Sequence, residues 1–147
     1  MHPSLPKNRE AEQVILGCCI VEPSRCMADV NHLSPRDFYF RPHQIVFETL
    51  QELYIKDHPI DLITLGNRLD EREKLADVGG RLFLTDLVGT VTTTTSSKYY
   101  GEIVKKKSTL RNIAQAGAEV ADTAYDENLD LKEVISIVQD LIWNATK

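Results

Sequence analysis

The sequence predicts an all-α protein, with a globular helical head followed by a projecting antiparallel helical hairpin. Apolar residues recur three and four positions apart through most of the 147 residues, which is the spacing of one helix face. The β-branched stretch 91–95 is short and lacks the alternation of a strand. The longest segment that can form one uninterrupted helix, 95–125, would span about 45 Å, which exceeds the diameter of a domain this small. Part of that helix must therefore project.

The composition is that of an ordinary globular protein with a hydrophobic core. Apolar residues make up 42% and charged residues 27% of the chain, and the length fits one domain or a domain with an appendage. The net charge of -5 argues against a polyanion held over the whole surface, although a local basic patch is compatible with it. The longest apolar run, 14–21, is far shorter than the ~20 residues of a membrane span, and 1–10 carries prolines and charges where a signal peptide needs apolar residues. We expect a cytoplasmic protein.

Capping residues mark the first helices of the head. Asn8 can cap a short, mostly buried helix, and Pro23 fits the first turn of a second helix that ends near Asn31. The segment Ser34–Asp37 places a hydroxyl cap, a first-turn proline and an N3 carboxylate in the order that starts another helical turn. The residues expected to face the core from this region are Ala11, Val14, Ile15, Cys18 or Cys19, Phe38 and Tyr39.

Three further helices complete the predicted head, residues 1–94. Pro42 restarts the chain as a helix of about fifteen residues. Asp61 can cap the next helix, and Gly79-Gly80 separates it from a last one at about 81–87. The apolar residues expected to be buried by these helices are Ile45, Val46, Leu50, Leu53, Tyr54, Leu62, Ile63, Leu65, Leu69, Leu82, Phe83, Leu84 and Leu87.

The predicted hairpin occupies residues 95–147. Six hydroxyl residues, 92–97, form a linker and cap before the long helix at about 95–125. A polar turn follows, and Asp130 with Glu133 resembles a capping box at the start of a second helix at about 130–146. The apolar stripe that this second helix is expected to bury consists of Leu131, Val134, Ile135, Val138, Leu141 and Ile142.

The two arms of the hairpin are unequal. The second helix spans only about 25 Å, so it pairs with the part of the long helix near 114–124 and leaves 99–107 to pack on the head. Two helices leave outer apolar positions uncovered, and a second hairpin would cover them. These positions include Ile113, Val120, Ile137 and Trp143. The last four residues bring no glycine stop, so we expect the native protein to continue.

No arrangement of residues in the sequence predicts an active site. The phosphate-binding motif G-x-x-x-x-G-K-[ST] is absent, and Gly79-Gly80 is better explained as a break between helices. The four histidines lack the spacing of metal ligands. Cys18, Cys19 and Cys26 form no C-x-x-C pair, so we expect small core residues and not disulfides or zinc ligands. We expect no catalytic residue, no cofactor and no metal in this chain.

One basic cluster supports an alternative function that the sequence leaves open. Lys105, Lys106, Lys107 and Arg111, which Lys98 extends, lie on the long helix and would fan over more than one of its faces. That arrangement favours a solvated face over a row of phosphate ligands. The alternative hypothesis is a helical DNA-binding module that uses this cluster.

Five stretches together carry a resemblance to a known family, and it covers nearly the whole chain. They are Glu10-Ala11-Glu12-Gln13 with Val14, Leu16 and Gly17; Asp37-Phe38-Tyr39 with Pro42-His43 and Ile45-Phe47; Pro59 to Leu65; Val78-Gly79-Gly80; and Tyr99-Tyr100 with Ile103-Val104, Lys107 and Leu110-Arg111. In this order and spacing they resemble the amino-terminal domain of the bacterial replicative DNA helicase, the DnaB family. The hydroxyl run departs from the family pattern, in which a proline and alanines more often precede the tyrosines. The start of the long helix is therefore open by several residues.

The resemblance implies the function of the chain. In the DnaB family, hairpins of neighbouring subunits pair, and dimers assemble into a hexameric ring-shaped collar above the ATPase ring. The same domain docks the C-terminal domain of primase and, in some members, the helicase loader. The ATPase domain, which uses ATP and Mg and carries the P-loop, is absent from this sequence, so the chain itself is not expected to be an enzyme. From the family pattern we expect primase contacts at Phe83, Ala114 and Val120, and subunit contacts at Ile113 and Trp143. Ile137 is expected at a primase or subunit contact.

Overall fold

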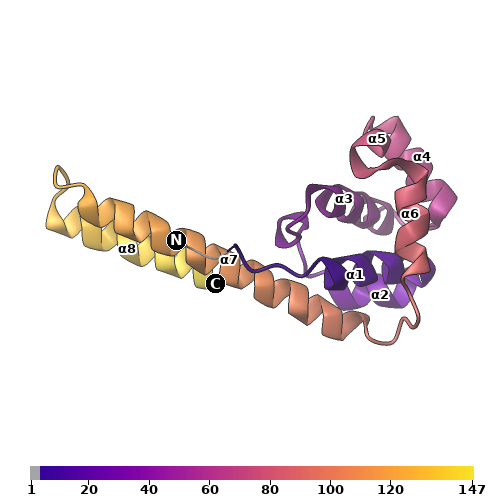
Figure 1. Cartoon of the computed structure of the whole chain (residues 1–147), viewed down its shortest axis with the longest axis horizontal. Coiled ribbons are helices and arrows are strands. Elements are labelled where there is room, and N and C mark those ends of the chain that lie inside the picture. The colour runs from indigo at the N-terminus through magenta and orange to yellow at the C-terminus, as the bar shows by residue number, and fades with distance from the viewer. Residues whose placement is uncertain (1–3) are drawn as a thin grey trace. The chain divides into compact units, whose positions relative to one another are not determined.

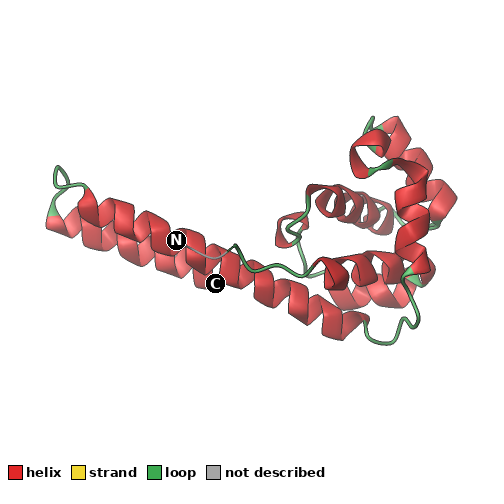
Figure 2. Cartoon of the chain, viewed as in Figure 1, coloured by secondary structure: helices red, strands yellow, loops and turns green. Residues whose placement is uncertain are grey.

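The fold is helical throughout the described part of the chain. The computed structural model describes residues 4–147, and these residues form α-helices, one 3-10 helix and no strand, which confirms the predicted class (Figure 2). His2 lies outside the described residues. The elements, labelled as in Figure 1, are α1 Arg9–Val21, α2 Pro23–Val30, η1 Pro35–Asp37, α3 Arg41–Ile55, α4 Leu62–Glu71, α5 Leu75–Val78, α6 Gly80–Gly89, α7 Ser97–Tyr125 and α8 Leu131–Thr146.

The chain divides into two compact units. The head unit comprises Lys7–Lys105, and the hairpin unit comprises Lys106–Lys147 with the first residues of the chain up to Pro6. Helix α7 begins at Ser97 and not at residue 95 as predicted, because the preceding threonines remain in a loop. It therefore contributes its first turns to the head unit and the remainder to the hairpin unit.

Side-chain caps start three elements of the head unit as predicted. The Asn8 side chain accepts a hydrogen bond from the backbone N–H of Ala11 at 2.9 Å and caps α1. Ser34 and Asp37 form a capping box at η1. The Asp61 carboxylate accepts the backbone N–H of Thr64 at 2.8 Å and caps α4. Short polar motifs therefore determine where these elements begin.

Helix α5 is an element that the sequence did not predict. It has four residues and lies between α4 and the glycine pair. Gly79 ends it with a φ of 110°, in the left-handed region that glycine adopts without a steric penalty. A single turn buries too few side chains to produce a helical periodicity, so the sequence carries no signal for this helix.

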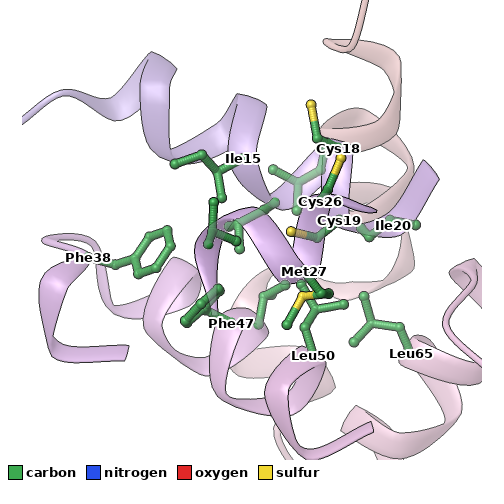
Figure 3. Close-up of a cluster of buried hydrophobic side chains, with 14 of the residues drawn as sticks. Ile15, Cys18, Cys19, Ile20, Cys26, Met27, Phe38, Phe47, Leu50 and Leu65 are labelled. Atoms are coloured by element: carbon green, nitrogen blue, oxygen red, sulfur yellow. The ribbon is translucent and has the colours of Figure 1, made fainter. Parts of the chain in front are cut away.

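Helix α1 lies inside the core of the head unit. Most of its residues from Ala11 onward are buried, so it is enclosed on more than one side. The rings of Phe38 and Phe47 pack against each other with centroids 4.7 Å apart. Figure 3 shows the apolar side chains of the neighbouring helices converging on the same region. The cysteines are buried free thiols within it, which confirms their predicted role.

Three residues predicted to face the core lie at the surface. Tyr39 is 38% exposed, Ile63 71% and Leu82 72%. Each lies one or two positions from a buried residue, namely Phe38 beside Tyr39, Leu65 near Ile63 and Leu84 near Leu82. Consecutive apolar residues in a helix or turn point in different directions, so one neighbouring layer cannot bury both. The predicted burial of these three residues is wrong.

The first turns of α7 complete the core of the head unit. Val104 is buried, and Tyr100 and Ile103 pack against the core. The hydroxyl of Ser97 donates to the Asp29 carboxylate at 2.7 Å. The predicted packing of this segment on the head is thus confirmed for these residues, whereas Tyr99 is exposed.

The hairpin unit pairs the later part of α7 with the antiparallel α8 (Figure 1). In the short turn between them, the backbone N–H of Asp126 donates to the Thr123 carbonyl at 3.2 Å. The predicted capping box is wrong, because the Asp130 side chain makes no capping hydrogen bond. The first turn of α8 is closed instead by the backbone N–H of Val134, which donates to the Asp130 carbonyl at 3.0 Å.

Helix α8 buries none of its residues, so the predicted buried stripe is wrong. Leu131, Ile135 and Ile142 are exposed, and the other predicted stripe positions are only half-buried. The amphipathic pattern is present in the sequence, but a single neighbouring helix covers only one side of it. The hairpin unit therefore carries an apolar surface larger than its own packing uses.

Candidate partner-binding surfaces

The hairpin unit exposes apolar side chains along both of its helices. Trp143 is 68% exposed, Ile113 45% and Ile137 38%. Ala114 is exposed and Val120 is half-buried. Trp143, Ile113, Ile137 and Val120 are termed the hairpin outer face. Complete burial of one large apolar side chain stabilises a protein by about 1.5–3 kcal/mol, so covering this face would supply a substantial free energy of association.

Two apolar grooves run along α7 in the hairpin unit. Small residues on α7 border both, and small side chains permit a close approach of another backbone. The groove between α7 and the end of α8 is lined by Ile113, Ala116, Gly117, Val120, Ile142, Ala145 and Thr146. The groove on the other edge is lined by Ser4, Leu5, Pro6, Ala114, Gln115, Gly117, Ala118 and Ala121.

The predicted basic cluster does not form one continuous row of surface cations. Arg111 is buried and its guanidinium donates to the Pro6 carbonyl at 3.0 Å. Lys105 is ion-paired with Asp37 at 3.6 Å. Lys98 and Lys106 are exposed, and Lys107 is half-buried. Two of the predicted ligands for phosphate thus serve internal contacts.

Phe83 lies over a buried polar pair in the head unit. Its ring stacks on the imidazole of His43 with centroids 5.9 Å apart and planes 17° apart. The Nδ1 atom of His43 lies 2.8 Å from the Glu12 carboxylate, and both side chains are at most 2% exposed. Because an ionised carboxylate only accepts hydrogen bonds, the imidazole donates from Nδ1. Phe83 is therefore held in place, half-buried, at the head surface.

The sequence did not predict the role of Glu12. Its carboxylate also accepts the backbone N–H groups of Tyr39 and Phe40, at 2.9 and 3.5 Å. These N–H groups belong to the two residues before α3, of which Phe40 is the N-cap and makes no side-chain capping hydrogen bond. The available signal was the position of Glu12 between residues of α1 that are buried. A carboxylate buried there needs hydrogen-bond donors.

Ionisable groups elsewhere in the head unit serve structure. Burial raises the pKa of the Cys18 thiol to about 11 and also raises that of Cys19. The Arg68 guanidinium holds the pKa of Glu52 below its usual value. Within residues 4–147, no group of acidic, histidine and cysteine side chains is arranged to hold a metal ion. The same residues include no helix long and apolar enough to cross a bilayer.

Comparison with known protein families identifies the head and the start of the hairpin. A family model described as the DnaB-like helicase N-terminal domain matches residues 4–106, which is more than half of the chain. The chain belongs to this family. The DnaB-like N-terminal domain is thus present, while the sequence of the chain carries no P-loop motif for an ATPase motor.

Curated relatives of this DnaB-like domain are replicative DNA helicases. The chain is 32% identical over 142 residues to the replicative DNA helicase DnaC of Bacillus subtilis, covering 97% of this chain and 31% of that protein. It is also 32% identical over 144 residues to the replicative DNA helicase DnaB of Mycobacterium leprae, covering 97% of this chain and 24% of the relative. The chain therefore spans a quarter to a third of the length of these relatives.

Solved structures show the same DnaB-like fold. The crystal structure of the N-terminal domain of DnaB helicase from Mycobacterium tuberculosis is similar with a TM-score of 0.91 and 35% identity, covering 96% of this chain and 99% of that one. A structure of a DnaB-like replicative helicase and its interactions with primase has a TM-score of 0.77 and 25% identity. It covers 91% of this chain and 31% of that chain. The helical hairpin is therefore a feature that this DnaB-like domain shares with solved relatives.

Proposed function

We propose that the chain is the N-terminal collar domain of a hexameric replicative DNA helicase. It would pair with a second subunit through the hairpin, assemble into a ring and dock the C-terminal domain of primase during DNA replication in the cytoplasm. The observation that carries the proposal is the hairpin outer face, on a helix α8 that buries none of its own residues. Membership of the DnaB-like family supports the same role.

The packing of the hairpin unit supports association with a second hairpin. Two antiparallel helices present one stripe to each other, and a four-helix arrangement covers a second stripe on every helix. Trp143 and Ile113 are large, apolar and exposed, which are the properties of side chains that dominate interface energies. The small residues bordering the grooves on α7 accommodate a partner helix at short distance.

Primase docking is proposed at one contact in the head unit and, separately, at two contacts on α7 of the hairpin unit, and Val120 is shared with the hairpin outer face. One structural neighbour is described with its primase interactions, which supports primase as a partner of this domain. Phe83 in the head unit and Ala114 and Val120 on α7 are the proposed contacts. A helicase loader is a further partner proposed from the family.

The self-association part of the proposal is tested by sedimentation equilibrium over a concentration series without ATP. We expect dimers or larger oligomers, and a variant Ile137→Glu that weakens association at least about tenfold, since it places a charge in the apolar contact. Leu82→Glu is the control, because it places the same charge on an exposed apolar residue of the head unit. Leu82 is 72% exposed and Ile137 38%. A chain that remains monomeric at high concentration would refute the dimer.

The primase part is tested by isothermal titration of the chain with the C-terminal domain of its cognate primase. We expect a complex that Phe83→Ala or Val120→Asp weakens. The exposed Ile55, on the head but outside the proposed surface, provides the control variant Ile55→Ala. Absence of any complex would leave self-association as the only function supported.

A further inference from the structure

A cluster of cations and aromatic rings lies on the head unit, where the Phe40 ring also contacts the imidazole of His43, the ring on which Phe83 stacks. The Lys7 ammonium lies 4.7 Å from the centre of the Tyr39 ring, and the Arg9 guanidinium lies 3.7 Å from the centre of the Phe40 ring. The two rings contact each other edge to face, with centroids 5.0 Å apart and planes at 83°. Cations at these distances from ring faces are attracted by the electron-rich faces. These four residues, together with Arg36 and Arg41 described below, are termed the head cation–aromatic cluster.

The backbone fixes the position of both rings. The buried Glu12 carboxylate accepts the N–H groups of Tyr39 and Phe40, and Asn8 caps the helix whose first residue is Arg9. The rings are thus held at the surface by a buried hydrogen-bond network and by a helix start. Tyr39 remains 38% exposed although the network that holds it is fully buried. A prearranged site loses less conformational entropy on binding than a flexible one.

The charges of the cluster are predominantly positive. Arg9, Arg36 and Arg41 are exposed, and the last two belong to the segment that carries the rings. The carboxylates of this region, Glu12 and Asp37, are buried and already paired, Glu12 with backbone N–H groups and Asp37 with the Ser34 N–H and with Lys105. Glu10 is the exposed acidic residue beside Arg9. A local positive patch therefore stands on a chain whose net charge is -5.

We infer that the head cation–aromatic cluster binds a single-stranded nucleic acid. The guanidinium groups would contact phosphates, while an unstacked base would lie on the exposed Tyr39 ring or on the outer plane of the Arg9 guanidinium. Alternating cations and rings are the arrangement that tracks a backbone and stacks bases without sequence preference. A duplex offers only its phosphates to this cluster, because its bases are already stacked on each other. An acidic peptide would use the charges but has no base to stack on the exposed ring.

The number of phosphate contacts determines how steeply the affinity falls with salt concentration. Each phosphate contact with a single strand contributes a slope of about -0.7 to the plot of log affinity against log salt concentration. The four cations of the cluster, Lys7, Arg9, Arg36 and Arg41, therefore set a limit of about -3 for the whole site. Removal of two of them should reduce the slope by about 1.4.

The experiment measures the fluorescence anisotropy of labelled oligo-dT and oligo-U with the 147-residue chain over a range of salt concentrations. Arg36→Gln with Arg41→Gln should weaken binding at least about fivefold and reduce the salt slope, while leaving the thermal unfolding curve unchanged. Tyr39→Leu should weaken binding by a similar factor without changing the slope, because it removes stacking and not charge. The matched control is Lys98→Gln with Lys106→Gln, which removes two exposed cations of α7 and should change the affinity less than about twofold.

Tighter binding of either oligonucleotide supports the inference and distinguishes DNA from RNA as the ligand. Absence of salt-dependent binding by both oligonucleotides overturns it. An equal loss in the Lys98 and Lys106 control would assign the binding to α7 and also overturns it. A polyglutamate peptide that competes as strongly as oligo-dT would show that charge alone is recognised, which contradicts a nucleic-acid site.

Discussion

Replacing Glu12 by alanine tests the hydrogen-bond network that holds the head together. The change removes a buried carboxylate and leaves the N–H groups of Tyr39 and Phe40, and the ring of His43, without their acceptor. Loss of one partner from a buried ionic network costs about 3–5 kcal/mol. A domain of this size has a stability of roughly 5–15 kcal/mol, so the loss is a large fraction of it.

The measurement is urea and thermal unfolding followed by circular dichroism. At about 2–4 °C per kcal/mol for a chain of this length, the melting temperature of Glu12→Ala should fall by about 6–20 °C. Glu12→Gln keeps one acceptor oxygen and should lose less. Glu10→Ala, two residues away and exposed, should change the stability by less than about 0.5 kcal/mol. A loss below about 1 kcal/mol for Glu12→Ala would show that the network does not stabilise the head.

Three further predictions follow from local geometry. A Cβ on Gly17 would lie 2.3 Å from a backbone carbonyl of α6, so Gly17→Ala should lower the free energy of unfolding by about 1–3 kcal/mol in a urea titration. Gly89 has open space around it, so the control Gly89→Ala should be neutral or stabilising in the same titration. With a pKa of about 11, the Cys18 thiol should be about one part in a thousand thiolate at pH 8, so Ellman's reagent should react with it only on unfolding, and reaction in the native state would contradict its burial. The backbone N–H of Thr64 holds the pKa of Asp61 below its usual 3.8. The Asp61 cap should therefore stabilise the protein above pH 3.8 and lose this effect as the pH falls through the lowered pKa. Acid unfolding of Asp61→Asn should depend less on pH in this range.

The sequence predicted the helices whose ends carry polar signals. Asn8, Ser34 and Asp61 each accept the backbone N–H that their position in the chain indicated, because capping is a local interaction. The order of the helices and the all-α class follow from such signals and from apolar periodicity. Local interactions therefore explain where these three elements begin.

Burial was predicted less well because it depends on distant parts of the chain. Ile63 and Leu82 lie on amphipathic helices, but periodicity cannot reveal which part of an apolar stripe a neighbour covers. The stripe of α8 shows the same limit, since no second neighbour is present for it. The pairing of Glu12 with His43 joins residues 31 positions apart, which no local pattern encodes.

The structure gives the exposure of the predicted contact residues but does not identify their partners. Ile113, Ala114 and Trp143 are exposed on the hairpin unit, and Phe83 is half-buried on the head unit. Exposure is necessary for a contact but does not identify the partner. Their assignment to subunit or primase contacts remains a proposal that rests on the family and on the variants described above.

The fluorescence of Trp143 tests the proposed hairpin contact most directly. It is the single tryptophan of the chain and lies 68% exposed on the hairpin outer face, so it reports on that surface alone. If hairpins pair through this face, its emission should shift to shorter wavelength and its quenching by iodide should fall as the chain is concentrated, with the same midpoint as the sedimentation data. Oligomers whose Trp143 keeps the emission and quenching of an exposed indole would contradict the contact.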